Sequence, residues 1–285
     1  MEDAWAGVFA VVAVVAVLVG VAGVLFERSR VYGSDVLWLV GRVVTEQEAD
    51  VCMRYLRRHR MHRVFGGLAG VAVGLVFGTR WDATAGLSIG GAGGPLGDVI
   101  FCGVAGVIFG ALSAESFRLR LPRSGPVAAS LALRPRLPLH RTVVGAWVLV
   151  VAGAGIAVAG LAWQGDAVGL QAVALGVVVQ GMGTVTRRAI AHRRRPVLSE
   201  RALEIDGRMR GFASASVARL QASMGWLVVF WALVSLPEDA GRWTVVFALA
   251  SVGAFVLAIV YLRRAAPRPP KGWGVLPAPQ TGAAA

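Results

Sequence analysis

Seven long runs of uncharged, mainly apolar residues divide the chain, and they constrain its fold more than any other feature. A helix that crosses the hydrocarbon core of a bilayer needs about 20 such residues, with roughly 17 to 25 as the usual range. Lipid cannot hydrogen-bond to the backbone, so each run is expected to be helical. We therefore predict an all-α, multi-pass membrane protein with seven transmembrane helices. The runs are Ala4–Phe26, Val64–Thr79, Val99–Ala114, Thr142–Gly165, Ala167–Thr186, Leu220–Pro237 and Trp243–Leu262.

The second and third runs are shorter than the others, at 16 residues each. A helix of that length is about 24 Å long, and snorkelling by Arg63 and Arg80 extends the second. The competing interpretation is a re-entrant pair. It would draw Arg80, Asp82 and Asp98 toward hydrocarbon, at roughly 2.5 to 3.5 kcal/mol for each at the centre. We favour two short spans.

The distribution of basic residues predicts the orientation. The net charge of +13 is compatible with nucleic-acid binding, but only 16% of the residues are charged, against roughly 25% in soluble domains. The basic residues lie between the runs, which indicates a topological signal and a contact with anionic lipid headgroups rather than nucleic acid. All except Arg80 and Arg242 lie in gaps that the positive-inside rule places in the cytoplasm, with the N-terminus outside and the C-terminus inside. These gaps are 27–63, 115–141, 187–219 and 263–285.

Glycine recurs at helical spacing in the second and third runs. Such a spacing leaves a ridge without side chains, on which a neighbouring helix can pack closely in lipid. We predict a glycine zipper that joins the two spans as a hairpin; a glycine-lined pore and an oligomer interface are the alternatives. The residues are Gly66, Gly70, Gly74, Gly78, Gly103, Gly106 and Gly110.

Two of the cytoplasmic segments carry an apolar stripe at helical spacing. The first, 45–63, begins with the capping box Thr45 to Glu48 and continues into the second span. The second, 198–219, precedes the sixth span. We predict amphipathic lead-in helices near the membrane surface.

The remaining segments are expected to have little regular structure. The loop from Asp82 to Gly97 is rich in glycine and is expected to be irregular. The segment 265–285 is predicted to be a disordered cytoplasmic tail, so that 1–264 forms the membrane domain.

One block resembles a known group of proteins. The residues are Ala114-Glu115, Arg118, Arg120, Pro122-Arg123, Ala128-Ala129-Ser130-Leu131 and Arg134. They are similar to a block in uncharacterised integral membrane proteins of actinobacteria. The resemblance covers about a tenth of the chain and implies only the class and the source.

Two arginine clusters flank the spans on the cytoplasmic side and are expected to contact lipid or a protein partner. They are Arg57, Arg58, Arg60 and Arg63, and Arg193, Arg194 and Arg195. Glu115 is expected to pair with Arg118 or with the first cluster.

Cys52, His59 and His62 are candidates for a zinc site by residue type. The field of the neighbouring arginines opposes a cation, and no fourth ligand lies near in the sequence. We therefore predict no metal and no cofactor.

No ionisable residue falls in the middle of a run, where a proton-coupled transporter is expected to have one. The deepest polar pair is Gln180 and Thr184, one helical turn apart. No phosphate-binding loop or hydrolase motif occurs, so an enzyme is not expected. We predict a structural or interaction component of the cytoplasmic membrane, with a protein partner or a homo-oligomer as possible assemblies. The alternative is a small-solute permease or channel that uses the glycine-rich spans.

Overall fold

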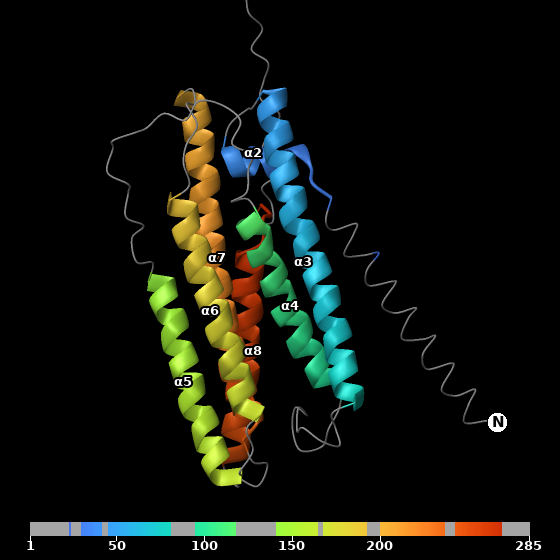
Figure 1. Ribbon diagram of the computed structural model, residues 1–285, viewed down its shortest axis with the longest axis vertical. Helices are drawn as coiled ribbons and strands as arrows, with labels where there is room; N and C mark the ends of the chain where they lie inside the picture. Colours follow the sequence, from blue (N-terminus) through green and yellow to red (C-terminus); the bar gives the residue numbers. More distant parts are fainter. Residues whose placement is uncertain are drawn as a thin grey trace, which may run out of the picture.

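The computed structural model describes Gly23 and residues 30–41, 45–80, 95–117, 141–164, 168–192, 200–236 and 243–269. This part of the chain is all-α, as predicted, and contains no strand (Figure 1). Five of its helices, α4 to α8, are long and apolar enough to cross a membrane. The helices are α2 (Gly33–Val40), α3 (Glu46–Arg80), α4 (Pro95–Phe117), α5 (Arg141–Gln164), α6 (Val168–His192), α7 (Glu200–Val234) and α8 (Thr244–Arg264).

The five helices correspond to the third to seventh runs of the sequence. The second run lies within α3, which is not among these five helices. The first run lies outside the described residues, apart from Gly23. α4 begins at Pro95, so the end of the loop predicted to be irregular is helical. The rest of that loop lies outside the described part.

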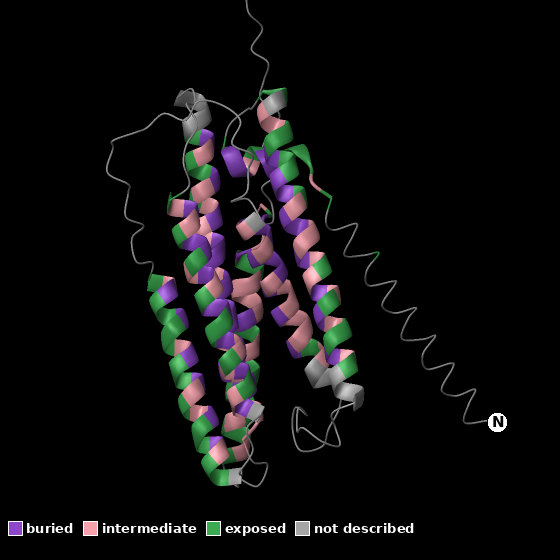
Figure 2. Ribbon diagram, in the orientation of Figure 1, coloured by how far each residue is buried: buried purple, intermediate pink, exposed green. Residues whose placement is uncertain are grey.

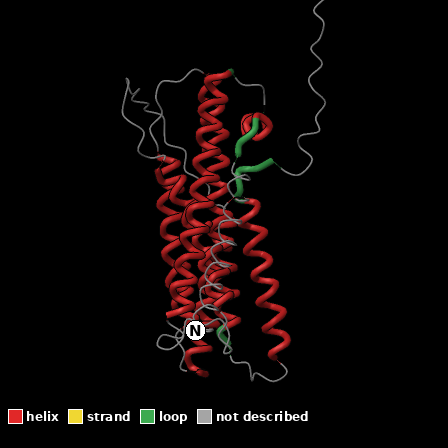
Figure 3. Tube along the Cα trace, turned by 90° about the vertical axis from the view of Figure 1, so that its right-hand side faces the viewer, coloured by secondary structure: helices red, strands yellow, loops and turns green. Residues whose placement is uncertain are grey.

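The long helices alternate in direction and lie side by side, while α2 lies across them at one end (Figures 1 and 3). α7 is at the centre and packs against α4, α5, α6 and α8. Its apolar window is 72% buried, against 17% for α8 at the periphery. Leu220, Met224 and Leu227 of α7 have no exposed surface, and buried residues gather along α7 in Figure 2. The core therefore surrounds α7.

α3 packs chiefly against α4, and at several glycines the backbones of the two helices meet directly. A Cβ atom added to Gly66 would overlap the carbonyl oxygen of Gly106, and one added to Gly106 would overlap that of Gly66. Gly70 and Gly110 face the carbonyl oxygens of Cys102 and His62 in the same way. Side chains would hold the helices apart, so glycine is what permits this approach.

The two lead-in segments are continuous with the helices that follow them. α3 and α7 each have 35 residues, or about 52 Å at 1.5 Å per residue, against roughly 30 Å for a hydrocarbon core. Each lead-in therefore shares the axis of its span, and its position near the membrane surface stays a prediction. The capping box at Thr45 is confirmed: the Thr45 amide donates to Glu48 and the Glu48 amide to the Thr45 hydroxyl.

A small apolar cluster joins the two lead-ins through α2. Val36 of α2, Leu56 of α3 and Met209 of α7 are buried together. The rings of Trp38 and Phe212 meet edge to face, with centroids 5.6 Å apart. We call this end of the molecule, where α3 and α7 begin and α4, α6 and α8 end, the basic end.

The first residues of the segment predicted to be a disordered tail are packed against this end. Ala265 has no exposed surface and Pro267 is also buried. For residues 265–269 the prediction of disorder is wrong, because the chain is held by hydrogen bonds to side chains of α3 and α7. The remainder, from residue 270, lies outside the described residues.

Candidate functional site: an arginine-lined cavity

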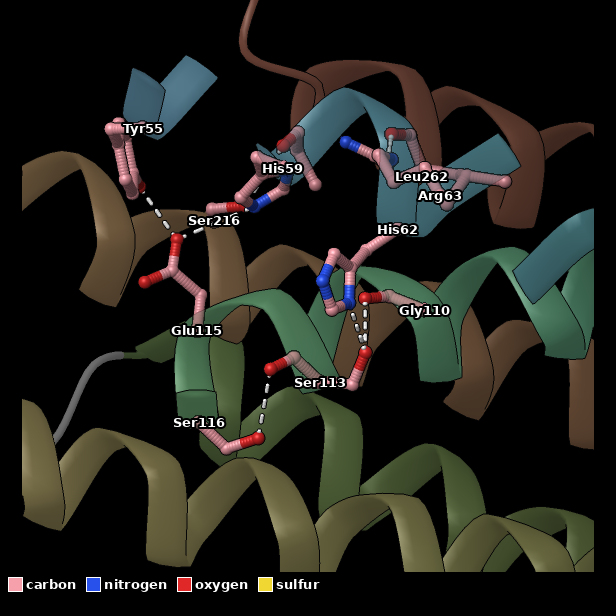
Figure 4. A network of polar contacts seen from close by, with 11 residues as sticks. Tyr55, His59, His62, Arg63, Gly110, Ser113, Glu115, Ser116, Ser216 and Leu262 are labelled. Atoms are coloured by element: carbon pink, nitrogen blue, oxygen red, sulfur yellow. Dashed lines mark hydrogen bonds and ion pairs between the residues drawn. The ribbon is translucent and has the colours of Figure 1, made fainter. Parts of the chain in front are cut away.

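Arginines of α3 and α7 cap the C-terminal end of α8. The last carbonyl groups of a helix have no partner within it and carry a partial negative charge, which favours cations there. Arg63 Nη2 donates to the Leu262 carbonyl at 2.8 Å, as Figure 4 shows. Arg219 Nη1 donates to the Arg264 carbonyl at 2.8 Å. The end of α8 is therefore fixed by side chains from two other helices.

Arg60 and Ser216 extend this capping beyond the helix. Ser216 Oγ donates to the Ala265 carbonyl at 2.8 Å, and Arg60 Nη2 donates to the Pro267 carbonyl at 2.9 Å. Arg60 also pairs with Asp35 of α2 at 2.9 Å, and both side chains are buried. A buried charge is costly unless it is paired and hydrogen-bonded. Arg60 meets that condition and connects α2, α3 and the segment after α8.

Arg63 has donors that this capping does not use. Arg63 is only 9% exposed, and its Nη1 is buried with no hydrogen-bond partner in the described part of the chain. Burial, and then the charge of Arg268, lower the pKa of Arg63 to about 10. The guanidinium therefore remains a cation at neutral pH. A guanidinium has five N–H donors. Arg63 therefore presents a positive charge, and its Nη1 has no hydrogen-bond acceptor in the described part of the chain.

A cavity of about 1260 Å³ borders these arginines. It exceeds the roughly 300 to 1,000 Å³ of ordinary small-molecule pockets. One part of its wall is apolar and includes Trp38, Val64, Val107 and Phe212. No described residue of the wall is acidic. We call it the arginine-lined cavity, after Arg60, Arg63, Arg219, Arg263, Arg264 and Arg268.

A second buried polar group lies nearby, between α3 and α4. The Tyr55 hydroxyl donates to Glu115 Oε1 at 2.6 Å, and His59 Nε2 lies 3.4 Å from the same oxygen (Figure 4). Burial is the largest influence on the pKa of His59 and lowers it; the Glu115 carboxylate raises it, Arg63 and Arg58 lower it, and the net result is a pKa below the ordinary value. His59 is therefore neutral at pH 7, and the contact is not a full ion pair.

The residues considered for zinc are not gathered into a site. Cys52 is buried in the cluster with α2, and His59 faces Glu115. His62 Nδ1 lies 2.9 Å from Ser113 Oγ, whose hydroxyl donates to the Gly110 carbonyl. Among the described residues, no three His, Cys, Asp or Glu side chains are grouped closely enough to hold a metal ion.

The polar pair of the fifth run forms a contact between α6 and α7. Gln180 Nε2 donates to the Gln221 backbone carbonyl at 2.9 Å, and Gln221 Nε2 donates to that of Gln180 at 3.1 Å. Thr184 Oγ1 donates to the Gln180 carbonyl at 2.8 Å. The side-chain oxygens of both glutamines are buried without a hydrogen-bond partner in the described part.

The first arginine cluster does not form one surface. Arg57 is exposed and Arg58 is half-buried, whereas Arg60 and Arg63 are buried within the chain. Arg60 and Arg63 bond to carbonyl groups at and beyond the end of α8, and Arg60 also pairs with Asp35, so part of their charge is used within the chain. Contact of these two with lipid or a partner stays a prediction. The second cluster, Arg193, Arg194 and Arg195, lies outside the described residues.

The other predicted site residues occupy different places. Glu115 contacts Tyr55 and His59, whereas Arg118 or the first arginine cluster was expected as its partner; Arg118 lies outside the described part. Gly103 meets a side chain, that of Val71, rather than backbone. Gly74 is buried on α3, and for Gly78 only its place in α3 is described.

Four residues with polar contacts in the structure were not predicted: Asp35, Tyr55, Ser216 and Gln221. Gln221 carried a signal, because it is a polar residue within an apolar run and such residues usually pair between membrane helices. Asp35 and Tyr55 lie in gaps rich in charge, where nothing in the sequence separates a buried group from a solvated one.

Comparisons with protein-family models, curated proteins and solved structures find no match to this chain. Its class rests on the helices alone: five of them are long and apolar enough to cross a membrane, consistent with a multi-pass membrane protein.

Proposed function

We propose that the chain is a non-catalytic interaction component of the cytoplasmic membrane, whose basic end binds anionic lipid on the cytoplasmic side. In this proposal the chain has seven spans, with the first run and α3 added to the five helices, an outer N-terminus and an inner C-terminus. The source we propose is an actinobacterium, on the resemblance of the block around 114–134. A protein partner or a second copy of the chain at the basic end belongs to the same proposal.

The arginine-lined cavity is the observation that carries this function. Basic pockets between membrane helices on the cytoplasmic side are typical sites for anionic headgroups. Arg60 and Arg63 hold the wall in place through their capping bonds. Around the cavity, exposed residues such as Arg263 and Arg264 add positive charge at the same end. A preference for anionic over neutral lipid follows from this charge.

The test compares lipids on the purified protein. A ligand that binds the folded state raises its stability, so phosphatidylglycerol should raise the melting temperature in detergent more than phosphatidylcholine does. Replacing Arg193, Arg194 and Arg195 by glutamine should reduce this difference, and more so at low salt. Equal effects of the two lipids on the wild-type protein would refute the proposal.

The orientation has its own test. Reporter fusions near Gly93 and Glu238 should behave as external, and fusions near Ser130, Pro196 and Lys271 as cytoplasmic. An internal result at Gly93 would contradict the two-span hairpin and favour a re-entrant pair.

A small-solute permease is the second candidate, favoured by the buried Gln180 and Gln221 side-chain oxygens that lack hydrogen-bond partners in the described part. Under this alternative, replacing Gln180 by leucine and Thr184 by valine should abolish a cellular function in a protein that still folds. Neutralising Arg193 to Arg195 should leave that function intact. The proposed interaction component predicts the reverse result for both variants.

A further inference from the structure

We propose that the arginine-lined cavity is a specific site for one phosphate group, with Arg63 Nη1 as a donor. This inference rests on the proposed function and adds a defined site and a ligand class to it. The phosphate can belong to an anionic lipid or to a free phosphate, and the experiment below separates these sources.

The first argument is the donor. Arg63 Nη2 donates to the Leu262 carbonyl at 2.8 Å, and Arg63 Nη1 is buried without a hydrogen-bond partner among the described residues. Buried polar groups are nearly always hydrogen-bonded, so this nitrogen indicates a missing acceptor. Arginine suits a phosphate because two of its N–H groups match two phosphate oxygens.

The second argument is the charge of the wall. Arg219 also lines the cavity, and its Nη1 donates to the Arg264 carbonyl at 2.8 Å. Arg60 is neutralised by Asp35, but no acidic residue of the described wall offsets the remaining arginines. Backbone carbonyl dipoles offset the positive charge of these arginines only in part, and a phosphate in the cavity would offset more of it.

The third argument is the apolar part of the wall, which favours a lipid as the source. Val64 and Gly67 begin the glycine-packed part of α3, and Val107 faces them from α4. These residues lie on the membrane side of Arg63 along the helix. A ligand with a phosphate and an acyl chain would contact both parts of the wall.

Two pairs of variants test the site, each with a matched control. Arg63→Gln removes the donor, and Arg57→Gln changes an exposed arginine of the same helix that does not line the cavity. Gly211→Trp adds a large side chain at the wall of the cavity and replaces no arginine, and the position is open because a Cβ added to Gly211 meets nothing within 4 Å. Gly207→Trp is its control: Gly207 is equally open and lies one turn earlier on α7, but it does not line the cavity.

The measurement is native mass spectrometry of the full chain in detergent, titrated with phosphatidylglycerol. We expect one retained lipid per wild-type chain. Binding should weaken at least about tenfold in Arg63→Gln and Gly211→Trp, the loss that a charge-assisted hydrogen bond produces. Both controls should stay within about twofold of the wild type. Because Gly211→Trp leaves every arginine in place, it keeps the test valid if Arg63→Gln does not fold.

A parallel titration uses inorganic phosphate alone. If phosphate binds as tightly as the lipid and displaces it, the site is supported and its source is a free phosphate; if only the lipid binds, the source is a headgroup. If Gly211→Trp retains the lipid as well as Gly207→Trp does, the site is wrong, even where the protein still prefers anionic lipid through its exposed arginines. If the wild type prefers no anionic lipid and binds no phosphate, the proposed function fails together with the site.

Discussion

The α3–α4 contact and the α6–α7 contact both contain glycine, but they use it differently. Between α3 and α4, glycine faces backbone, and Gly66 and Gly106 each approach the carbonyl oxygen of the other. Between α6 and α7, glycine faces side chains: Gly183 lies against the Gln221 amide and Gly176 against Val228. At Gly66 and Gly106 no side chain can move aside, whereas the groups that face Gly176 and Gly183 can rotate.

This difference predicts how each contact tolerates change. Backbone-to-backbone packing gains dispersion over many atoms but cannot be rearranged locally. A contact through glutamine side chains is directional and can relax, and hydrogen bonds between membrane helices contribute only about 0.6 kcal/mol on average. A single substitution should therefore lower the free energy of unfolding strongly at the α3–α4 contact and only moderately at the α6–α7 contact.

The largest expected effect is at the α3–α4 contact. Gly106→Ala should lower the free energy of unfolding by about 3 kcal/mol or more, the upper range for overpacking, because the new methyl group would overlap backbone. Gly155→Ala on α5 is the control, since a Cβ there meets nothing within 4 Å. It should be neutral or slightly stabilising by helix propensity. Unfolding in detergent would measure both, and equal effects would show that the helices are not packed this closely.

An intermediate effect is expected at the α6–α7 contact. Gln221→Leu removes the bond to the Gln180 carbonyl and should cost about 0.6 to 1.7 kcal/mol. Gln171→Leu is the control, because Gln171 is exposed on the same helix as Gln180. The same unfolding experiment applies. A loss from Gln221→Leu as large as that from Gly106→Ala would contradict the distinction between the two contacts.

The smallest expected effect is the dependence of stability on pH through His59, which lies between α3 and α4 with Tyr55 and Glu115. Burial lowers the pKa of His59 in the folded protein, so the unfolded state binds more protons once the pH falls below about 6.5, the ordinary pKa. Stability should therefore decrease as the pH falls from 7 through 6.5 and below.

The melting temperature between pH 7.5 and pH 5 would measure this dependence. His59→Gln should flatten it, because the substituted side chain does not titrate. Some slope should remain, since burial also lowers the pKa of His62. An unchanged slope in His59→Gln would show that other groups cause the pH dependence.

Several features of the fold were readable from the sequence because they depend on local spacing. Charge-free runs of sufficient length predicted the helices α4 to α8, since lipid leaves the backbone no alternative. The capping box at Thr45 needs only two residues three positions apart. The four-residue spacing of Gly66 and Gly70 indicated a ridge, although not which partner carbonyls it would meet.

The site was not readable because its partners are distant in the sequence and are backbone atoms. Arg63 bonds to the carbonyl of Leu262, 199 residues away, and every residue offers a carbonyl, so no pattern singles this one out. Exposed Arg57 and buried Arg60 lie within one turn of the same helix. The positions of α2 and of the segment after α8 decide which of the two is internal.

The caps on α8 also set an order for biosynthesis. At about 5 to 20 residues per second, Arg63 is made on the order of 10 to 40 s before Leu262, its acceptor 199 residues later. The interval is longer for Arg60, because its acceptor Pro267 follows it by 207 residues. Until α8 emerges from the ribosome, these cations have only water, headgroups or earlier parts of the chain as partners. Closure of the basic end is therefore a late event of translation, and a nascent chain halted before α8 would keep that end open.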